Sequence, residues 1–156
     1  MPIEQVTVIG AGAWGTALAQ VAAMAGRQVS LLVRDPGVAD EINLQHTNSR
    51  HLGAQRLSDW ITASTSFTDA DLVILATPAQ ATRHALQGHH GALSGLPVVL
   101  TAKGLEQSTL KRQSEILFET IPDAVPFVLS GPSFASDVAA GRPTAVTLAG
   151  DDPDAT

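Results

Sequence analysis

The chain has 156 residues, of which 44% are apolar and 15% charged, a composition that supports one hydrophobic core of ordinary globular size. Its formal net charge is −6, and its nine Lys and Arg residues form no basic run, which argues against a nucleic-acid-binding surface. The absence of cysteine excludes disulfides, thiolate metal sites and cysteine nucleophiles. No signal peptide and no apolar run of about 18 residues is visible, so we expect a cytoplasmic protein without a membrane span.

The first motif is Gly10-Ala11-Gly12-Ala13-Trp14-Gly15, which follows an apolar run at residues 6–9. Helical spacing at residues 16–25, ended by Gly26, leads to a second apolar run at residues 29–33. This pattern predicts a strand, a tight turn, a helix and a strand. In a dinucleotide-binding turn the first glycine reverses the backbone, the second admits a pyrophosphate, and the third lets the helix approach the strand.

The rest of the chain alternates between the two kinds of element. Apolar runs predict strands at residues 60–64, 71–76, 97–102, 126–130 and 144–149, and helical spacing predicts helices at 38–44, 80–87, 110–120 and 134–140. The helix at 110–120 would place Leu110, Ser114, Leu117 and Phe118 on one side, and residues 45–60 are expected to form an irregular connection. The alternation predicts an α/β fold with a doubly wound, mostly parallel sheet of the Rossmann type.

Arg34 follows the second predicted strand, where the residue facing the adenosine ribose lies in such folds. An arginine there accommodates a 2′-phosphate, so we expect NADPH to be preferred, with NAD as an alternative. Asp35 would bind the ribose of NADH if the turn is shifted by one residue, and Arg34 would then be an ordinary surface side chain.

Ligands bind beyond the carboxyl ends of parallel strands, and four turns are predicted there. They are Gly10 to Gly15, Thr77-Pro78, Lys103-Gly104 and Gly131-Pro132-Ser133. Lys103 would bind an anionic substrate or polarise its carbonyl, unless it is a solvated loop lysine. The fourth turn, Gly131-Pro132-Ser133, is either an anion site or a simple helix cap.

No metal site is expected, because the five histidines lack ligand spacing with carboxylates. The adjacent pair His89-His90 is interpreted as a solvated end of a helix.

The strings VIGAGAWGTALA, AKGLE and LSGPSFASDVAAGRPTAV together resemble the N-terminal half of the bacterial NAD(P)-dependent glycerol-3-phosphate dehydrogenase family. The resemblance covers nearly the whole chain, and the last two strings are more specific than the glycine motif. It implies reversible hydride transfer between NAD(P)H and dihydroxyacetone phosphate or sn-glycerol 3-phosphate, for glycerophospholipid synthesis.

The resemblance also implies roles for individual positions. Ala13, Trp14, Arg34 and Ala135 match cofactor contacts, Lys103 matches a lysine that touches cofactor and substrate, and Gly131 and Ser133 match substrate contacts. His51 stands where the family often has an aromatic residue in an Asn-x-x-Tyr-Leu-Pro pattern, from which Asn48-Ser49-Arg50-His51-Leu52-Gly53 departs. The expected cofactor-binding residues are Gly10, Gly12, Ala13, Trp14, Gly15, Arg34, His51, Pro78, Lys103 and Ala135, and the expected substrate-binding residues are Lys103, Gly131 and Ser133.

Members of this family continue into a helical C-terminal domain that supplies the general acid/base lysine. We therefore expect residues 1–156 to be a shortened NAD(P)-binding domain that binds cofactor, contains no catalytic residue and is inactive alone. The sequence leaves open whether the full-length protein forms a homodimer. The alternatives are a related hydroxy-acid or ketopantoate-type dehydrogenase, which the AKGLE and GPSFA turns disfavour, and a non-catalytic dinucleotide sensor.

Overall fold

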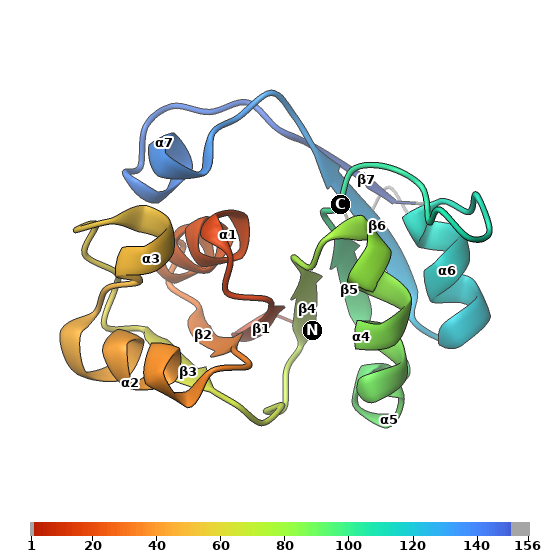
Figure 1. The fold of residues 1–156 in the computed structure, drawn as a ribbon, viewed down its shortest axis with the longest axis horizontal. Helices are drawn as coiled ribbons and strands as arrows, with labels where there is room; N and C mark the ends of the chain where they lie inside the picture. The colour runs from red at the N-terminus through yellow and green to blue at the C-terminus, as the bar shows by residue number, and fades with distance from the viewer. Residues whose placement is uncertain (1, 151–156) are drawn as a thin grey trace.

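The computed structural model describes residues 2–150 and contains one mixed sheet (Figure 1). Its strands are β1 (Gln5–Ile9), β2 (Gln28–Leu32), β3 (Ile61–Ser64), β4 (Leu72–Leu75), β5 (Pro97–Leu100), β6 (Val125–Ser130) and β7 (Thr147–Gly150). They lie in the order β3-β2-β1-β4-β5-β6-β7, and every neighbouring pair is parallel except β6 and β7. The predicted doubly wound, mostly parallel sheet is confirmed.

Helices cover the sheet on both faces (Figure 1). They are α1 (Ala13–Met24), α2 (Pro36–Gln45), α3 (Ser49–Leu52), the 3-10 helix η1 (Ala79–Ala81), α4 (Thr82–Gly88), α5 (His90–Leu93), α6 (Gln113–Thr120) and α7 (Ala135–Ala139). One core cluster joins α1 and α2 to β1, β2 and β3, and a second joins α4, α5 and α6 to β4 and β5.

The central strands are buried on both faces, which explains their continuous apolar sequences. In β5, Val99 belongs to the core cluster under α1 and α2, whereas Val98 and Leu100 belong to the cluster under α4 and α6. In β1, Val8 and Ile9 divide between the same two clusters. Successive side chains point to opposite faces of a strand, so each face of the sheet receives its own set.

Two predicted segments have more helix than expected. The connection at residues 45–60 is not wholly irregular, because α3 forms within it. The single helix predicted at 80–87 is instead η1 followed by α4, and α5 begins at His90, separated from α4 by one residue.

The prediction that a helix spans residues 110–120 is wrong at its start and in its buried face. The helix α6 begins only at Gln113, since Leu110 has a φ of 59° that an α-helix cannot contain. Leu110 and Phe118 are 72% and 70% exposed, whereas Ile116 and Leu117 are buried. The buried face of α6 therefore includes Leu117 of the predicted side but not Leu110 or Phe118.

The last strand departs from the parallel pattern. β7 begins at Thr147, three residues later than predicted, and runs antiparallel to β6 at the edge of the sheet. Within residues 2–150, no helix combines the length and apolar character needed to cross a bilayer.

Candidate functional site

The glycine-rich turn between β1 and α1 is pressed against the end of β4. Gly10 has a φ of 109°, and a Cβ there would lie 2.8 Å from the carbonyl oxygen of Ala76. A Cβ on Gly15 would lie 1.9 Å from the carbonyl oxygen of Gly10. Any side chain at either position would separate the helix, the turn and β4, so both positions require glycine.

Gly12 lies on the open side of the same turn. It is the extended N-cap of α1, and no atom outside its immediate chain neighbourhood lies within 4 Å of where its Cβ would be. Its carbonyl accepts the Thr16 N–H at 2.9 Å, which is the first bond of the helix. Among residues 2–150, the N–H groups of Gly12, Ala13 and Trp14 meet no protein acceptor. Open amides at the start of a 12-residue helix favour an anionic group.

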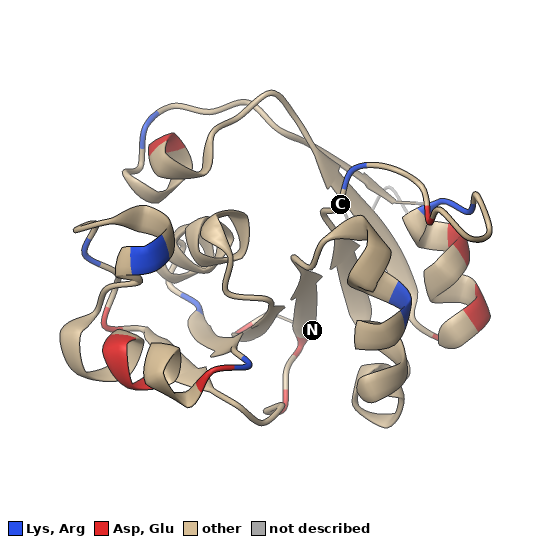
Figure 2. Ribbon diagram, in the orientation of Figure 1, with Lys and Arg blue, Asp and Glu red and all other residues tan. Residues whose placement is uncertain are grey.

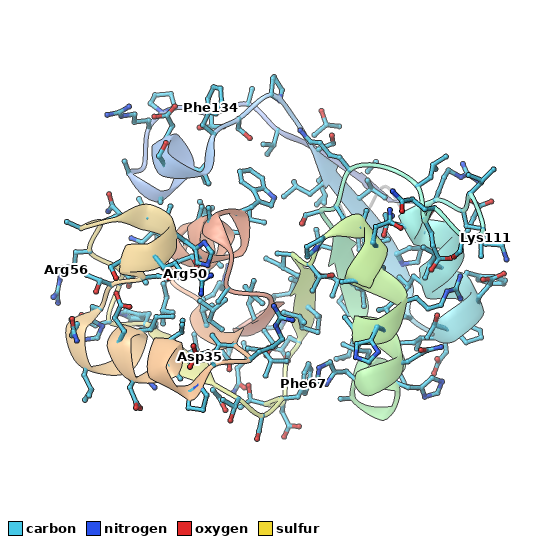
Figure 3. The ribbon with its side chains drawn as sticks, viewed as in Figure 1. Asp35, Arg50, Arg56, Phe67, Lys111 and Phe134 are labelled. Carbon is cyan, nitrogen blue, oxygen red and sulfur yellow. The ribbon has the colours of Figure 1, made fainter. Side chains whose placement is uncertain are left out.

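The corner after β2 separates the roles of Arg34 and Asp35. Asp35 is the N-cap of α2, and its carboxylate accepts the Gly37 N–H at 2.9 Å. Arg34 is exposed and forms no ion pair with any residue in the described range 2–150. Asp35 therefore has a structural function at this corner, and Arg34 is the charged side chain available beside it (Asp35 is labelled in Figure 3).

The other three turns follow β4, β5 and β6, which succeed β1 in that order across the sheet and run parallel to it. The Lys103 ammonium donates a hydrogen bond to the Gly131 carbonyl at 3.2 Å, so the last two turns touch. Thr77 Oγ1 and Ser133 Oγ are buried without a partner among the described residues. Buried hydroxyls in folded proteins normally have a hydrogen-bond partner, so these two hydroxyls could bond to a ligand at this edge of the sheet.

Ser133 also borders a cavity of about 410 Å³. Pro132, Phe134, Asp137 and Arg142 line it as well. The Arg142 guanidinium donates to the Asp137 carboxylate at 2.6 Å, so its charge is compensated within the protein. Phe134, beside α7, is 77% exposed and points outward (Figure 3).

The loop after Lys103 is held by two glutamine side chains from other elements. Gln80 donates to the Leu105 carbonyl at 2.8 Å and accepts the Gln107 N–H at 2.9 Å. Gln113, from the first turn of α6, donates to the Gly104 carbonyl at 2.9 Å. Because these contacts begin at the residue after Lys103, they set the position of the lysine backbone.

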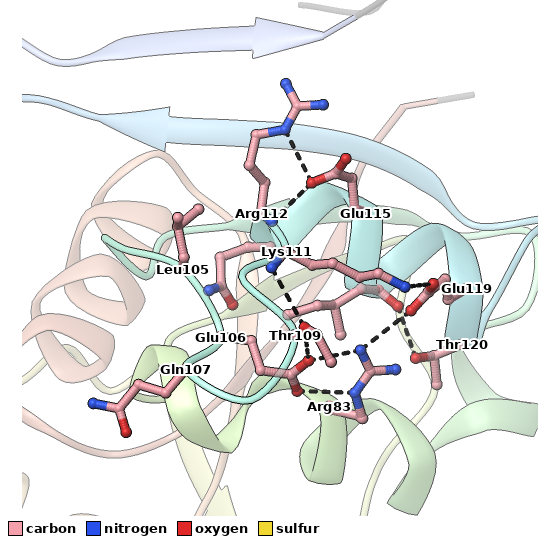
Figure 4. Close-up of polar contacts among 12 residues, drawn as sticks. Arg83, Leu105, Glu106, Gln107, Thr109, Lys111, Arg112, Glu115, Glu119 and Thr120 are labelled. Atoms are coloured by element: carbon pink, nitrogen blue, oxygen red, sulfur yellow. Dashed lines mark hydrogen bonds and ion pairs between the residues drawn. The ribbon is translucent and has the colours of Figure 1, made fainter.

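Glu106 is the centre of this loop and is only 7% exposed. Both of its carboxylate oxygens accept bonds from Arg83 of α4 at 2.8 Å (Figure 4). The Arg83 bonds, together with one from the Thr109 hydroxyl, lower the pKa of Glu106 from its ordinary 4.5 to about 2. The same pair raises the pKa of Arg83. Glu119 binds Arg83 at 3.2 Å and also pairs with Lys111.

The histidines other than the adjacent pair His89-His90 lie on separate segments of the chain. His51 is exposed on α3, a helix that packs against α1. His89 is not fully solvated as predicted, because its ring lies 5.7 Å from that of Phe67 and burial lowers its pKa. No group of three His, Asp or Glu side chains within residues 2–150 could hold a metal ion.

The structure thus brings the predicted residues of β1, β4, β5 and β6 to one edge, and places Arg34 and His51 on the neighbouring β2 and α3 segments. Sequence reasoning missed Asn48, Gln80, Arg83 and Glu106, which hold these turns. Polar residues with long-range partners leave no periodic signal in a sequence. Lys and Arg residues are spread over several elements (Figure 2).

Replacing Arg83 with Met removes both bonds to Glu106 and leaves a nearly buried carboxylate without its main cation. We expect a lower free energy of unfolding at about pH 7, measured by urea denaturation. Because the folded-state pKa of Glu106 is depressed, its contribution is complete above the ordinary value of 4.5 and is lost as the pH falls towards about 2.

The loss caused by Arg83→Met should therefore shrink at about pH 3. Arg112→Met is the matched control, since Arg112 pairs with Glu115 on the surface and should change stability little at either pH. An equal loss for Arg83→Met at both values would show that the pair does not act through the ionised carboxylate.

Comparison with known proteins supports the same family as the sequence motifs. The family model described as the NAD-dependent glycerol-3-phosphate dehydrogenase N-terminus matches residues 5–156. A glycerol-3-phosphate dehydrogenase [NAD(P)+] of Maricaulis maris is 52% identical over 150 residues, covering 94% of this chain and 45% of the relative. The enzyme of the same name from Caulobacter vibrioides is 48% identical, covering 97% of this chain and 47% of the relative.

Among solved structures, glycerol-3-phosphate dehydrogenase from Coxiella burnetii superposes with a TM-score of 0.89 at 26% identity, covering 97% of this chain and 48% of that one. The chain spans about half the length of the curated relatives it matches. The family model covers nearly all of the sequence, and the fold agrees with that of the solved relative. The chain therefore belongs to the NAD-dependent glycerol-3-phosphate dehydrogenase N-terminal domain family.

Proposed function

We propose that this chain is the cofactor-binding domain of an NAD(P)-dependent glycerol-3-phosphate dehydrogenase. Such an enzyme transfers a hydride between NAD(P)H and dihydroxyacetone phosphate or sn-glycerol 3-phosphate. The observation that supports this most is the meeting of four ligand-type turns at the carboxyl ends of β1, β4, β5 and β6, in a chain of this family. Residues beyond this chain, in a further helical domain, are proposed to complete the active site.

The glycine-rich turn fits a dinucleotide. The pyrophosphate would lie against the open amides of Gly12, Ala13 and Trp14, where no Cβ at Gly12 blocks it. Gly10 and Gly15 keep the turn closed behind it, and His51, Pro78 and Ala135 would flank the cofactor from the surrounding segments. The nicotinamide supplies the hydride, and the protein supplies position and charge.

Lys103 is proposed to act on the substrate end of the site. Its ammonium now donates to the Gly131 carbonyl, which holds the side chain over the edge of the sheet. A substrate carbonyl or phosphate that replaced this contact would receive a charge-assisted hydrogen bond. Gly131 and Ser133 would contact the same substrate, since the Ser133 hydroxyl has no partner among the described residues.

Arg34 is proposed to select NADPH through its 2′-phosphate, because Asp35 is occupied at the cap of α2. Trp14 fluorescence in a Trp60→Phe background reports on cofactor binding. We expect NADPH to bind at least about tenfold more tightly than NADH, equivalent to about 1.4 kcal/mol. Arg34→Gln should weaken NADPH and leave NADH unchanged. Equal affinities in the unmodified protein would remove the proposed role of Arg34.

The proposed function itself is tested with the two lysines of the chain in the full-length enzyme. Lys103→Met should lower kcat/KM for dihydroxyacetone phosphate by about 10²- to 10³-fold while cofactor affinity is largely kept, as expected for a lost electrostatic contact in the transition state. Lys111→Met, which removes only a surface pair with Glu119, should leave activity nearly unchanged. Full dihydroxyacetone phosphate reduction by the Lys103 variant would contradict the assignment.

A further inference from the structure

Asn48 lies in the connection between α2 and α3, yet its side chain is completely buried. Its amide nitrogen, Nδ2, donates to the Ala11 carbonyl at 3.0 Å and to the Thr16 hydroxyl at 2.8 Å. Ala11 is inside the glycine-rich turn and Thr16 is in the first turn of α1. Asn48, which is distant in sequence, therefore binds the chain on both sides of the open amides of residues 12–14.

The orientation of the Asn48 amide follows from its partners. A backbone carbonyl only accepts hydrogen bonds, so the NH₂ end must face Ala11. Asn48 Oδ1 is then buried without a partner among the described residues. An unsatisfied buried oxygen costs folding free energy, so this side chain is poorly explained by stability alone.

The segment on either side of Asn48 is itself anchored. The Glu41 carboxylate, from α2, accepts the Ser49 N–H at 2.6 Å and the Thr47 hydroxyl at 2.9 Å. These bonds, that of the Ser49 backbone first, lower the pKa of Glu41. The residues before and after Asn48 are therefore both hydrogen-bonded to α2, which fixes the position of Asn48 beside the glycine-rich turn.

The bond to Ala11 determines which way the next amide points. The peptide between Ala11 and Gly12 is planar and trans, so its C=O and N–H point in opposite directions. With the Ala11 oxygen turned inward to Asn48, the Gly12 N–H points the opposite way, and no acceptor among residues 2–150 meets it.

We propose that Asn48 is a positioning residue for the pyrophosphate: by holding the Ala11 carbonyl inward, it keeps the Gly12 N–H aimed at the phosphate oxygens. This inference rests on the proposed cofactor function. Thr16, the second partner of Asn48, is equally buried but does not orient this peptide, so it provides a matched control.

The test compares Asn48→Leu and Thr16→Val in the full-length protein. Each variant is titrated with NADPH, with ADP-ribose, which keeps the pyrophosphate, and with adenosine 2′-phosphate, which lacks it. Asn48→Leu should weaken NADPH and ADP-ribose by at least about tenfold and leave adenosine 2′-phosphate unchanged, since only the pyrophosphate uses the reoriented amide. Thr16→Val should change all three by less than about threefold.

Asn48→Asp is the second variant if Asn48→Leu does not fold, because a carboxylate keeps the shape but cannot donate to Ala11. The same loss is expected for it. Unchanged NADPH affinity in a folded Asn48 variant, or an equal loss for all three ligands, would overturn the positioning role and leave the proposed function standing. If the unmodified protein bound neither NADPH nor NADH, both proposals would fall.

Discussion

The contact between the glycine-rich turn and the end of β4 is the constraint on which the rest of this structure depends. Gly10 and Gly15 have no space for a Cβ, because the Ala76 and Gly10 carbonyls occupy it. With that contact made, α1 starts close to the sheet, and the turn that carries its open amides packs against the end of β4. A side chain at either glycine would displace the helix and separate the proposed pyrophosphate site from Lys103.

Polar side chains from other elements hold the loops at this edge of the sheet. Asn48 fixes the turn after β1, while Gln80, Gln113 and the Arg83–Glu106 pair fix the loop after β5. In both places a nearly buried polar group replaces the regular hydrogen bonds that a strand or helix would provide. The parallel strands thus bring the turns to one edge of the sheet, and these few side chains hold the turns in the defined positions that ligand binding requires.

Local patterns in the sequence predicted most of the fold. Continuous apolar runs located the parallel strands, because strands buried on both faces need such residues, and Gly26 ended α1 with a φ of 78° as its position suggested. Non-local effects explain the errors. Leu110 belongs to a loop whose backbone is hydrogen-bonded to that of Glu106, so α6 begins later than predicted. Asn48 was counted with an irregular polar connection because its partners Ala11 and Thr16 are distant in sequence.

We propose above all that the turns after β1, β4 and β5 form one NAD(P)H site. It is tested most directly by recording the backbone amide NMR spectrum of the protein while NADPH is added. We predict that the largest shift changes fall on Gly12, Ala13 and Trp14 and on the turns at Thr77 and Lys103, all at the carboxyl edge of the sheet. Saturating NADPH that left these amides unchanged, or that shifted residues at the opposite edge, would contradict the account.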